Sequence, residues 1–134
     1  MSKRRRFQFI KIIASGGFGD VYLSKEINSN GIDRLVAIKV LKSDWVDNYE
    51  VVNRLQDEAR LLALLRHKNI INVFDMTSIQ GRASIIMEYV EGVDLSTIIS
   101  IMKKNRRRTP ISVALQIWVV SMLHIDNERM FETI

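Results

Sequence analysis

The sequence predicts an α+β fold: a five-stranded antiparallel sheet with one packed helix, followed by two further helices. Short apolar runs rich in β-branched residues recur through the first two thirds of the chain, and turn-forming glycines and asparagines separate them. A longer segment with a helical apolar period interrupts these runs after the third one. Two apolar stretches with helix-start signals fill the remaining third.

Three strands open the chain. We expect them at residues 7–14, 20–26 and 34–41, where Ile and Val supply apolar, β-branched bulk. A cluster of glycines separates the first two strands. Asn28-Ser29-Asn30-Gly31 turns the chain before the third strand, because Asn and Gly tolerate a positive φ.

A helix and two more strands complete the predicted sheet layer. Residues 49–66 place Val51, Leu55, Leu62 and Leu65 on one helical face, with charged residues between them. The pattern then predicts strands at 73–79 and 83–89, on either side of a turn at Gln80-Gly81.

The two last helices have recognisable starts. Asp94 is suited to cap a helix over residues 95–104. Pro110 suits the first turn of a helix that runs to about residue 124, because its missing N–H costs nothing there. Residues 111–125 are apolar but short for a membrane span, so a buried helix is favoured over a transmembrane segment.

Composition narrows the class of protein. Hydrophobic residues make up 47% of the chain and charged residues 26%, which is typical of a globular domain. The chain has no cysteine, which excludes disulfides and thiolate metal sites and agrees with a cytoplasmic location. The net charge is +5, concentrated in basic runs at residues 3–6 and 103–108. No aromatic residues are interleaved with the second run, so we expect no nucleic-acid partner.

Three features carry chemistry, and each has an ordinary structural interpretation when taken alone. The loop between the first two strands, Ala14 to Val21, is rich in glycines that could bring backbone N–H groups close to phosphates, or simply form a flexible hairpin turn. Lys39 lies in an apolar strand, where it needs a partner unless it lies at a solvated edge. Glu58 lies at the boundary of the apolar helix face, where a solvated glutamate is also common.

The joint occurrence of these features, with Arg66-His67-Lys68-Asn69-Ile70-Ile71 after them, resembles the N-terminal lobe of the eukaryotic-type (Hanks-type) protein kinases, especially bacterial serine/threonine kinases. The resemblance extends from about Phe9 to Leu123. It implies a kinase N-lobe and hinge at residues 7–92, the first helices of a C-lobe at 93–125 and a divergent tail at 126–134. The family reaction is transfer of the ATP γ-phosphate to serine or threonine hydroxyls.

The resemblance also implies an ATP site. Lys39 matches the lysine that holds the α- and β-phosphates, and Glu58 matches its helix partner. Val21 and Ala37 match the residues that cover the adenine, and Phe18 matches the aromatic at the tip of the glycine loop. The other implied loop residues are Ala14, Ser15, Gly16, Gly17 and Gly19.

The adenine end of the implied site follows the last strand. Met87 falls at the gatekeeper position. The Glu88 carbonyl and the Val90 backbone match the hinge groups that bond adenine. Asp94 falls where family members contact the ribose.

The chain departs from the family pattern at both ends of this region. Ala14 replaces the first loop glycine, and we expect a stiffer loop or weaker nucleotide binding because alanine disfavours a positive φ. The H-R-D, D-F-G and A-P-E motifs are absent, so we expect no catalytic base and no magnesium ligands. His124-Ile125-Asp126-Asn127 is no substitute, because it lacks the arginine and has Phe131 in place of the distant asparagine.

Several functions therefore stay open. The sequence favours an ATP-binding kinase fragment that is inactive alone, because the catalytic loop and the D-F-G motif are absent, and we expect the chain to be cut short within or just after the helix ending at residue 124. A non-catalytic binding module (a pseudokinase lobe), a gene remnant and one half of a split kinase are the alternatives. Apolar residues lie on several faces of the helix at 111–124, which predicts self-association, a covering protein or a complementary C-lobe chain.

Overall fold

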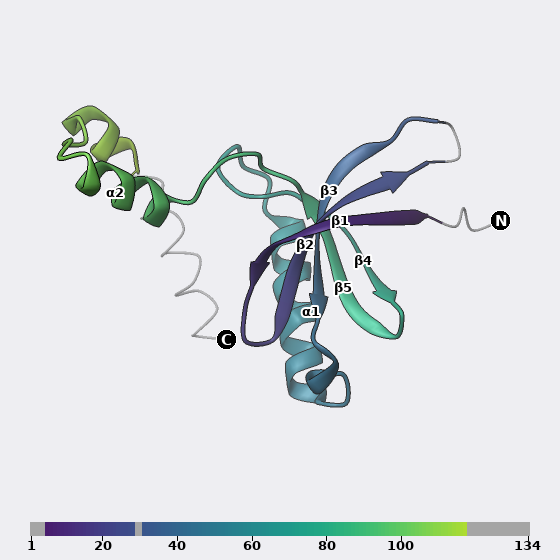
Figure 1. Cartoon of the computed structure of the whole chain (residues 1–134). Helices are drawn as coiled ribbons and strands as arrows, with labels where there is room; N and C mark the ends of the chain where they lie inside the picture. Colours follow the sequence, from purple (N-terminus) through teal and green to yellow (C-terminus); the bar gives the residue numbers. More distant parts are fainter. Residues whose placement is uncertain (1–4, 29–30, 118–134) are drawn as a thin grey trace. The chain divides into compact units, whose positions relative to one another are not determined.

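The computed structural model describes residues 5–28 and 31–117. The chain divides into two units, Met1–Val90 and Glu91–Ile134. The first unit contains a five-stranded sheet, a short 3-10 turn and one long helix, which confirms the predicted α+β class (Figure 1). Its elements are β1 (Arg6–Ser15), β2 (Gly19–Ile27), β3 (Arg34–Leu41), η1 (Ser43–Trp45), α1 (Tyr49–Leu64), β4 (Val73–Ile79) and β5 (Arg82–Glu88).

The sheet has the strand order β1-β2-β3-β5-β4, and each neighbouring pair is antiparallel. The central strand, β3, pairs with β2 on one side and β5 on the other. It is also the most deeply buried strand: Val36, Ile38 and Leu41 are almost wholly enclosed. Burial on both faces explains why this strand is a nearly continuous apolar run rather than an alternating one.

Apolar clusters lie on the two faces of the sheet. One face gathers Val36, Ile38, Val40 and Ile86. The other face packs beneath α1, which lies along the sheet in Figure 1. The buried members of that second cluster are Leu41, Leu55, Ala59 and Ile85.

Helix α1 begins where the sequence predicts and ends earlier. The Asn48 side chain accepts a hydrogen bond from the Val51 amide and so caps the first turn. The helix ends at Leu64, two residues before the predicted end at Arg66. The reason is local: Leu65 has extended backbone angles, φ −89° and ψ 115°, which stop the i to i−4 hydrogen bonds.

The other predicted boundaries are close to those observed. Strands β1 and β2 extend one residue further at each end than predicted, and β5 begins and ends one residue earlier. The 3-10 turn η1 was not predicted. Gln80 and Gly81 both have positive φ, 51° and 76°, as the predicted turn between β4 and β5 requires.

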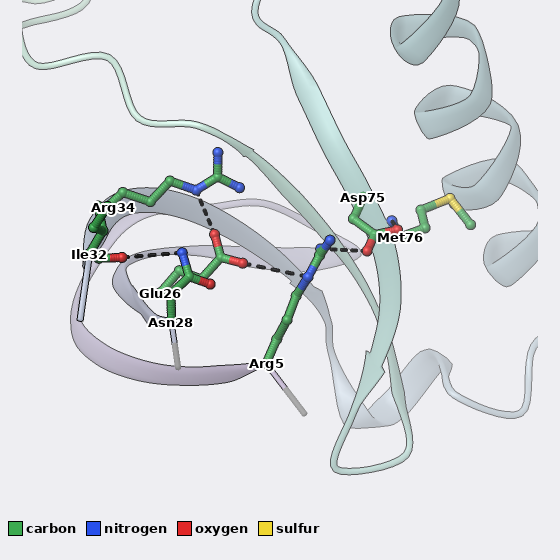
Figure 2. A network of polar contacts seen from close by, with 7 residues as sticks. All are labelled: Arg5, Glu26, Asn28, Ile32, Arg34, Asp75 and Met76. Atoms are coloured by element: carbon green, nitrogen blue, oxygen red, sulfur yellow. Dashed lines mark hydrogen bonds and ion pairs between the residues drawn. The ribbon is translucent and has the colours of Figure 1, made fainter. Parts of the chain in front are cut away.

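One charged network joins β2, β3 and β4 to Arg5, which precedes β1 (Figure 2). The Glu26 carboxylate on β2, with 3% of its side chain exposed, accepts a hydrogen bond from Arg34 Nε on β3 at 2.5 Å. Arg5, next to β1, lies 3.6 Å from Glu26 and 2.6 Å from Asp75 on β4. The Arg34 guanidinium also lies 4.2 Å from the centre of the Phe74 ring.

The second unit is helical where it is described. Helix α2 (Leu95–Lys104) is capped by Asp94, as predicted, and residues 111–117 form one further helical segment. The rest of the expected last helix, residues 118–124, lies outside the described residues. Within the described ranges, no helix is long and apolar enough to cross a membrane.

Candidate functional site

The centre of the candidate site is an ion pair between the sheet and α1. Lys39 projects from β3, and its Nζ lies 3.1 Å from both carboxylate oxygens of Glu58 on α1. The two side chains are 27% and 48% exposed, so the pair is accessible to solvent. Such exposed pairs contribute only about 0–1 kcal/mol to folding stability. The pair therefore matters more for where it holds the Lys39 ammonium than for stability.

Three apolar residues of the predicted site share the sheet face of Lys39. Val21 lies opposite Lys39 in the β2–β3 ladder, and Ala37 lies opposite Met87 in the β3–β5 ladder. Directly opposed residues and alternate residues of one strand point to the same face. That face is also the one on which α1 packs, because Met87 packs against the cluster under α1. Register thus places an ammonium beside a small apolar surface.

The glycine loop connects β1 to β2 as a tight hairpin. The Gly16 amide donates to the Gly19 carbonyl at 2.9 Å, and the Ser15 hydroxyl donates to the Asp20 carboxylate. A Cβ on Gly19 would lie 2.9 Å from the Val40 carbonyl oxygen, which no real side chain tolerates. Close approach of β3 therefore requires glycine at position 19.

The expectation that Ala14 stiffens the loop through its backbone angles was wrong. Ala14 lies within β1, where it pairs with Val21. Among the residues that the structure describes, the only non-glycine positions with positive φ are Gln80 and Arg106. Since an extended backbone suits alanine as well as glycine, this replacement carries no conformational penalty at position 14.

The structure adds loop contacts that the sequence did not suggest. Lys42 Nζ donates to the Gly16 carbonyl at 2.6 Å, and Trp45 Nε1 donates to the Gly17 carbonyl at 3.2 Å. Both residues follow β3, at η1. No spacing or motif distinguishes them in the sequence, because the contact depends on how the sheet brings the hairpin to the end of β3.

The end of β5 is held in place by Asn72, the residue that precedes β4. The Glu88 carboxylate accepts hydrogen bonds from the backbone and side-chain N–H groups of Asn72, and the Glu88 amide donates to the Asn72 carbonyl at 2.8 Å. Val90, two residues further on, has 64% of its side chain exposed. Asn72 thus fixes both the backbone amide and the side chain of Glu88 at this end of β5.

Asp94 belongs to the second unit, and both of its carboxylate oxygens are engaged with Thr97. One oxygen accepts from the Thr97 amide at 2.7 Å and the other from the Thr97 hydroxyl at 2.9 Å. These hydrogen bonds, the backbone one first, lower the pKa of Asp94 below its ordinary value of 3.8. The expected ribose contact of Asp94 stays a prediction.

The assembled residues suit binding of an anion rather than acid–base chemistry. The site offers the Lys39 ammonium, an apolar sheet face, and the amides of Gly17 and Phe18, which donate to no group of the described residues. In the described ranges, no three His, Cys, Asp or Glu side chains are grouped so that they could hold a metal ion.

Comparison with protein families gives one match that spans most of the chain: residues 7–127 match the protein kinase domain. A tyrosine-protein kinase of Myxococcus xanthus, MasK, is 31% identical over 91% of this chain, which covers 19% of that protein. The serine/threonine-protein kinase PrkC of Bacillus subtilis is 37% identical over 71% of this chain, which covers 14% of that protein. The chain thus spans less than a fifth of either relative.

A solved structure agrees with the sequence matches. The kinase domain of Mycobacterium tuberculosis PknI superposes with a TM-score of 0.64 at 25% identity. The match covers 86% of this chain and 44% of that domain.

Proposed function

This chain belongs to the protein kinase family, and from that premise we propose that residues 7–92 form a lobe that binds ATP. The observation that carries the proposal is the Lys39–Glu58 ion pair, with each Nζ–O distance at 3.1 Å. In this family a strand lysine paired with a helix glutamate holds the α- and β-phosphates. The same pairing in this chain supports a phosphate-binding role for Lys39.

The adenine ring has a matching surface on the same sheet face. Val21 and Ala37 supply small apolar side chains beside Lys39, and Met87 borders them from β5. We assign the adenine hydrogen bonds to the backbone of Glu88 and Val90. The anchoring of Glu88 by Asn72 supports this assignment, because it fixes the strand end from which the hinge backbone continues.

The glycine loop completes the phosphate end. Residues 14–19 form the hairpin between β1 and β2, whose backbone N–H groups suit negatively charged oxygens. Lys39, opposite Val21 in the ladder, lies just past this hairpin. A charged side chain and backbone dipoles thus serve the same phosphates from adjacent strands.

We propose that these 134 residues bind nucleotide without transferring phosphate. The sequence contains no H-R-D or D-F-G motif, and the described residues offer no ligand set for the magnesium ion that accompanies ATP in this family. Phosphoryl transfer in this family also needs a base for the nucleophile and ligands for magnesium, which the H-R-D and D-F-G motifs supply. We propose serine and threonine hydroxyls as the targets of the family's phosphate transfer, because PrkC is named a serine/threonine-protein kinase.

The proposed protein partner covers the exposed apolar side chains of the second unit. Helix α2 leaves Leu95, Ile98, Ile99 and Ile101 at least 40% exposed, and Ile111 is 78% exposed. Apolar surface of this extent favours a covering protein surface. We propose that a complementary C-lobe chain packs there.

Nucleotide titration tests the central proposal. ATP is titrated by calorimetry into the unaltered chain, a Lys39→Met variant and a Lys68→Met control, which removes an exposed lysine outside the site. We expect saturable binding that Lys39→Met weakens by about tenfold or more, the factor for a lost charged hydrogen bond, and that Lys68→Met leaves unchanged. Equal binding by all three proteins would contradict the assignment of Lys39.

A further inference from the structure

Three consecutive carbonyl groups of the glycine loop accept hydrogen bonds from two residues of the β3–α1 connection. The Gly16 carbonyl accepts from Lys42 Nζ at 2.6 Å, and the Gly17 carbonyl accepts from Trp45 Nε1 at 3.2 Å. The Phe18 carbonyl accepts from the Lys42 amide at 2.9 Å. Two residues thus fix the orientation of every peptide group across the tip of the hairpin.

Side-chain contacts support the same arrangement. The Phe18 ring meets the Trp45 ring edge to face, with centroids 5.1 Å apart. Lys42 Nζ also lies 3.7 Å from the Asp20 carboxylate, which accepts a hydrogen bond from the Ser15 hydroxyl. Both strands of the hairpin are therefore connected to the end of β3.

The orientation of the carbonyls determines the orientation of the amides. In a trans peptide group the C=O and the following N–H point in opposite directions. Since the Gly16 and Gly17 carbonyls face Lys42 and Trp45, the amides of Gly17 and Phe18 face away from them. Across the described part of the chain, neither amide donates to a protein group. Two consecutive unpaired amides form a site suited to an anion.

We propose that Lys42 and Trp45 are positioning residues that hold the Gly17 and Phe18 amides ready for the phosphates of a bound nucleotide. This inference rests on the proposed ATP-binding function. The two side chains act through the loop carbonyls and do not touch the nucleotide. Because Lys42 and Trp45 hold the loop in one conformation, its amides are already oriented before phosphate binds. Less conformational entropy is then lost on binding.

The test separates the phosphate contribution from the adenosine contribution. Calorimetry measures the dissociation constants of ATP and adenosine for the unaltered chain and for Lys42→Met and Trp45→Phe variants. Trp45→Phe keeps a ring against Phe18 but removes the N–H donor, and Lys42→Met keeps the length but removes the ammonium. We expect each variant to bind ATP about three- to tenfold more weakly, the range for one lost hydrogen bond, with adenosine binding unchanged.

Two controls accompany the variants. Lys25→Met removes one positive charge at the other end of β2, where Lys25 pairs with Asp33 at 2.9 Å; we expect an unaltered ratio of ATP to adenosine affinity. Lys42→Arg retains a charged donor, and we expect it to recover most of the ATP affinity.

The outcomes are distinguishable. Loss of ATP affinity alone in both variants supports the positioning role. Equal losses for ATP and adenosine would mean that the variants damage the fold, and unaltered ATP affinity would mean that the loop needs no such support; either result overturns the inference while ATP binding stands. If the unaltered chain binds no ATP, the proposed function fails and the inference fails with it.

Discussion

At the residue scale, the glycines of the loop differ in why they are needed. Gly19 lies so close to β3 that an added Cβ would meet the Val40 carbonyl oxygen at 2.9 Å. Gly17 has no atom within 4 Å of such a Cβ, although it belongs to the same loop. Packing against β3 therefore constrains the side chain at position 19, whereas a side chain at position 17 would meet no neighbouring atom.

This difference gives a matched pair of substitutions. Gly19→Ala is expected to lower the free energy of unfolding by about 1–3 kcal/mol, because the backbone of β2 or β3 must shift to relieve the overlap. Gly17→Ala is expected to change it by less than about 0.5 kcal/mol. Urea unfolding followed by circular dichroism measures both values. Equal stability of the two variants would show that β2 and β3 do not approach as closely as described.

The sequence predicts the residues of the candidate site better than their contacts. Lys39 stands out because an ammonium within an apolar strand needs a partner, and Glu58 lies on the next helix. Lys42 and Trp45 have no such signal, since a lysine and a tryptophan after a strand are compatible with many roles. Their hydrogen bonds to the loop arise from the hairpin's tertiary position, which periodicity does not encode.

At the element scale, strand positions were predictable because burial imposes regular patterns. Residues 34–41 and 73–79 match β3 and β4 end to end. The short turn η1 was missed because three residues are too few for a periodic signal. The end of α1 was misplaced because Leu65 keeps the apolar helical spacing while its backbone is already extended. Ion pairs between residues far apart in the sequence, such as Arg5–Asp75, leave no pattern in the local sequence.

The buried carboxylate in Figure 2 gives a prediction about the sheet. Arg34→Met leaves Glu26, 3% exposed, with Arg5 at 3.6 Å as its remaining cation. We expect a loss of about 1–3 kcal/mol in unfolding free energy, because a buried acceptor then lacks its closest donor. Arg60→Met, which breaks the exposed Arg60–Asp57 pair, is the control and should be nearly neutral. Thermal melts of equal midpoint would contradict this account.

The cap of α2 predicts a pH dependence. The pKa of Asp94 is lowered by its hydrogen bonds with Thr97, so the charged carboxylate stabilises the helix above pH 3.8, and this contribution is lost as the pH falls through the lowered pKa. The Thr97 amide signal in an NMR titration should therefore shift with a midpoint below 3.8. Asp94→Asn retains a capping oxygen and should abolish that transition. A midpoint at or above 3.8 would contradict the cap.

At the scale of the whole molecule, the two units differ in how their apolar residues are covered. The first unit encloses Val36, Ile38, Ile85 and Ile86 almost completely. In the second unit, none of the described residues is buried. This difference is the one that the proposed covering partner of the second unit would remove, because such a partner would bury the exposed apolar side chains.

Exposed apolar helices predict self-association of the isolated chain. Sedimentation velocity at increasing concentration should show species larger than 15.5 kDa, because apolar side chains of the second unit become buried against other copies. An Ile101→Gln, Ile111→Gln variant should shift the distribution towards monomer. Ile32→Gln, which alters an exposed residue of the first unit, is the control and should leave it unchanged. A monomeric unaltered chain at all concentrations would contradict the prediction.

The most direct test of the central claim maps where ATP binds. Backbone amide signals of the isotopically labelled chain are followed by NMR as ATP is added. We expect saturable shifts at the glycine loop, at Ala37 to Lys39 and at Glu88 to Val90, with little change on β4. No shifts at saturating ATP, or shifts confined to the basic run at 103–108, would contradict an ATP-binding lobe centred on Lys39.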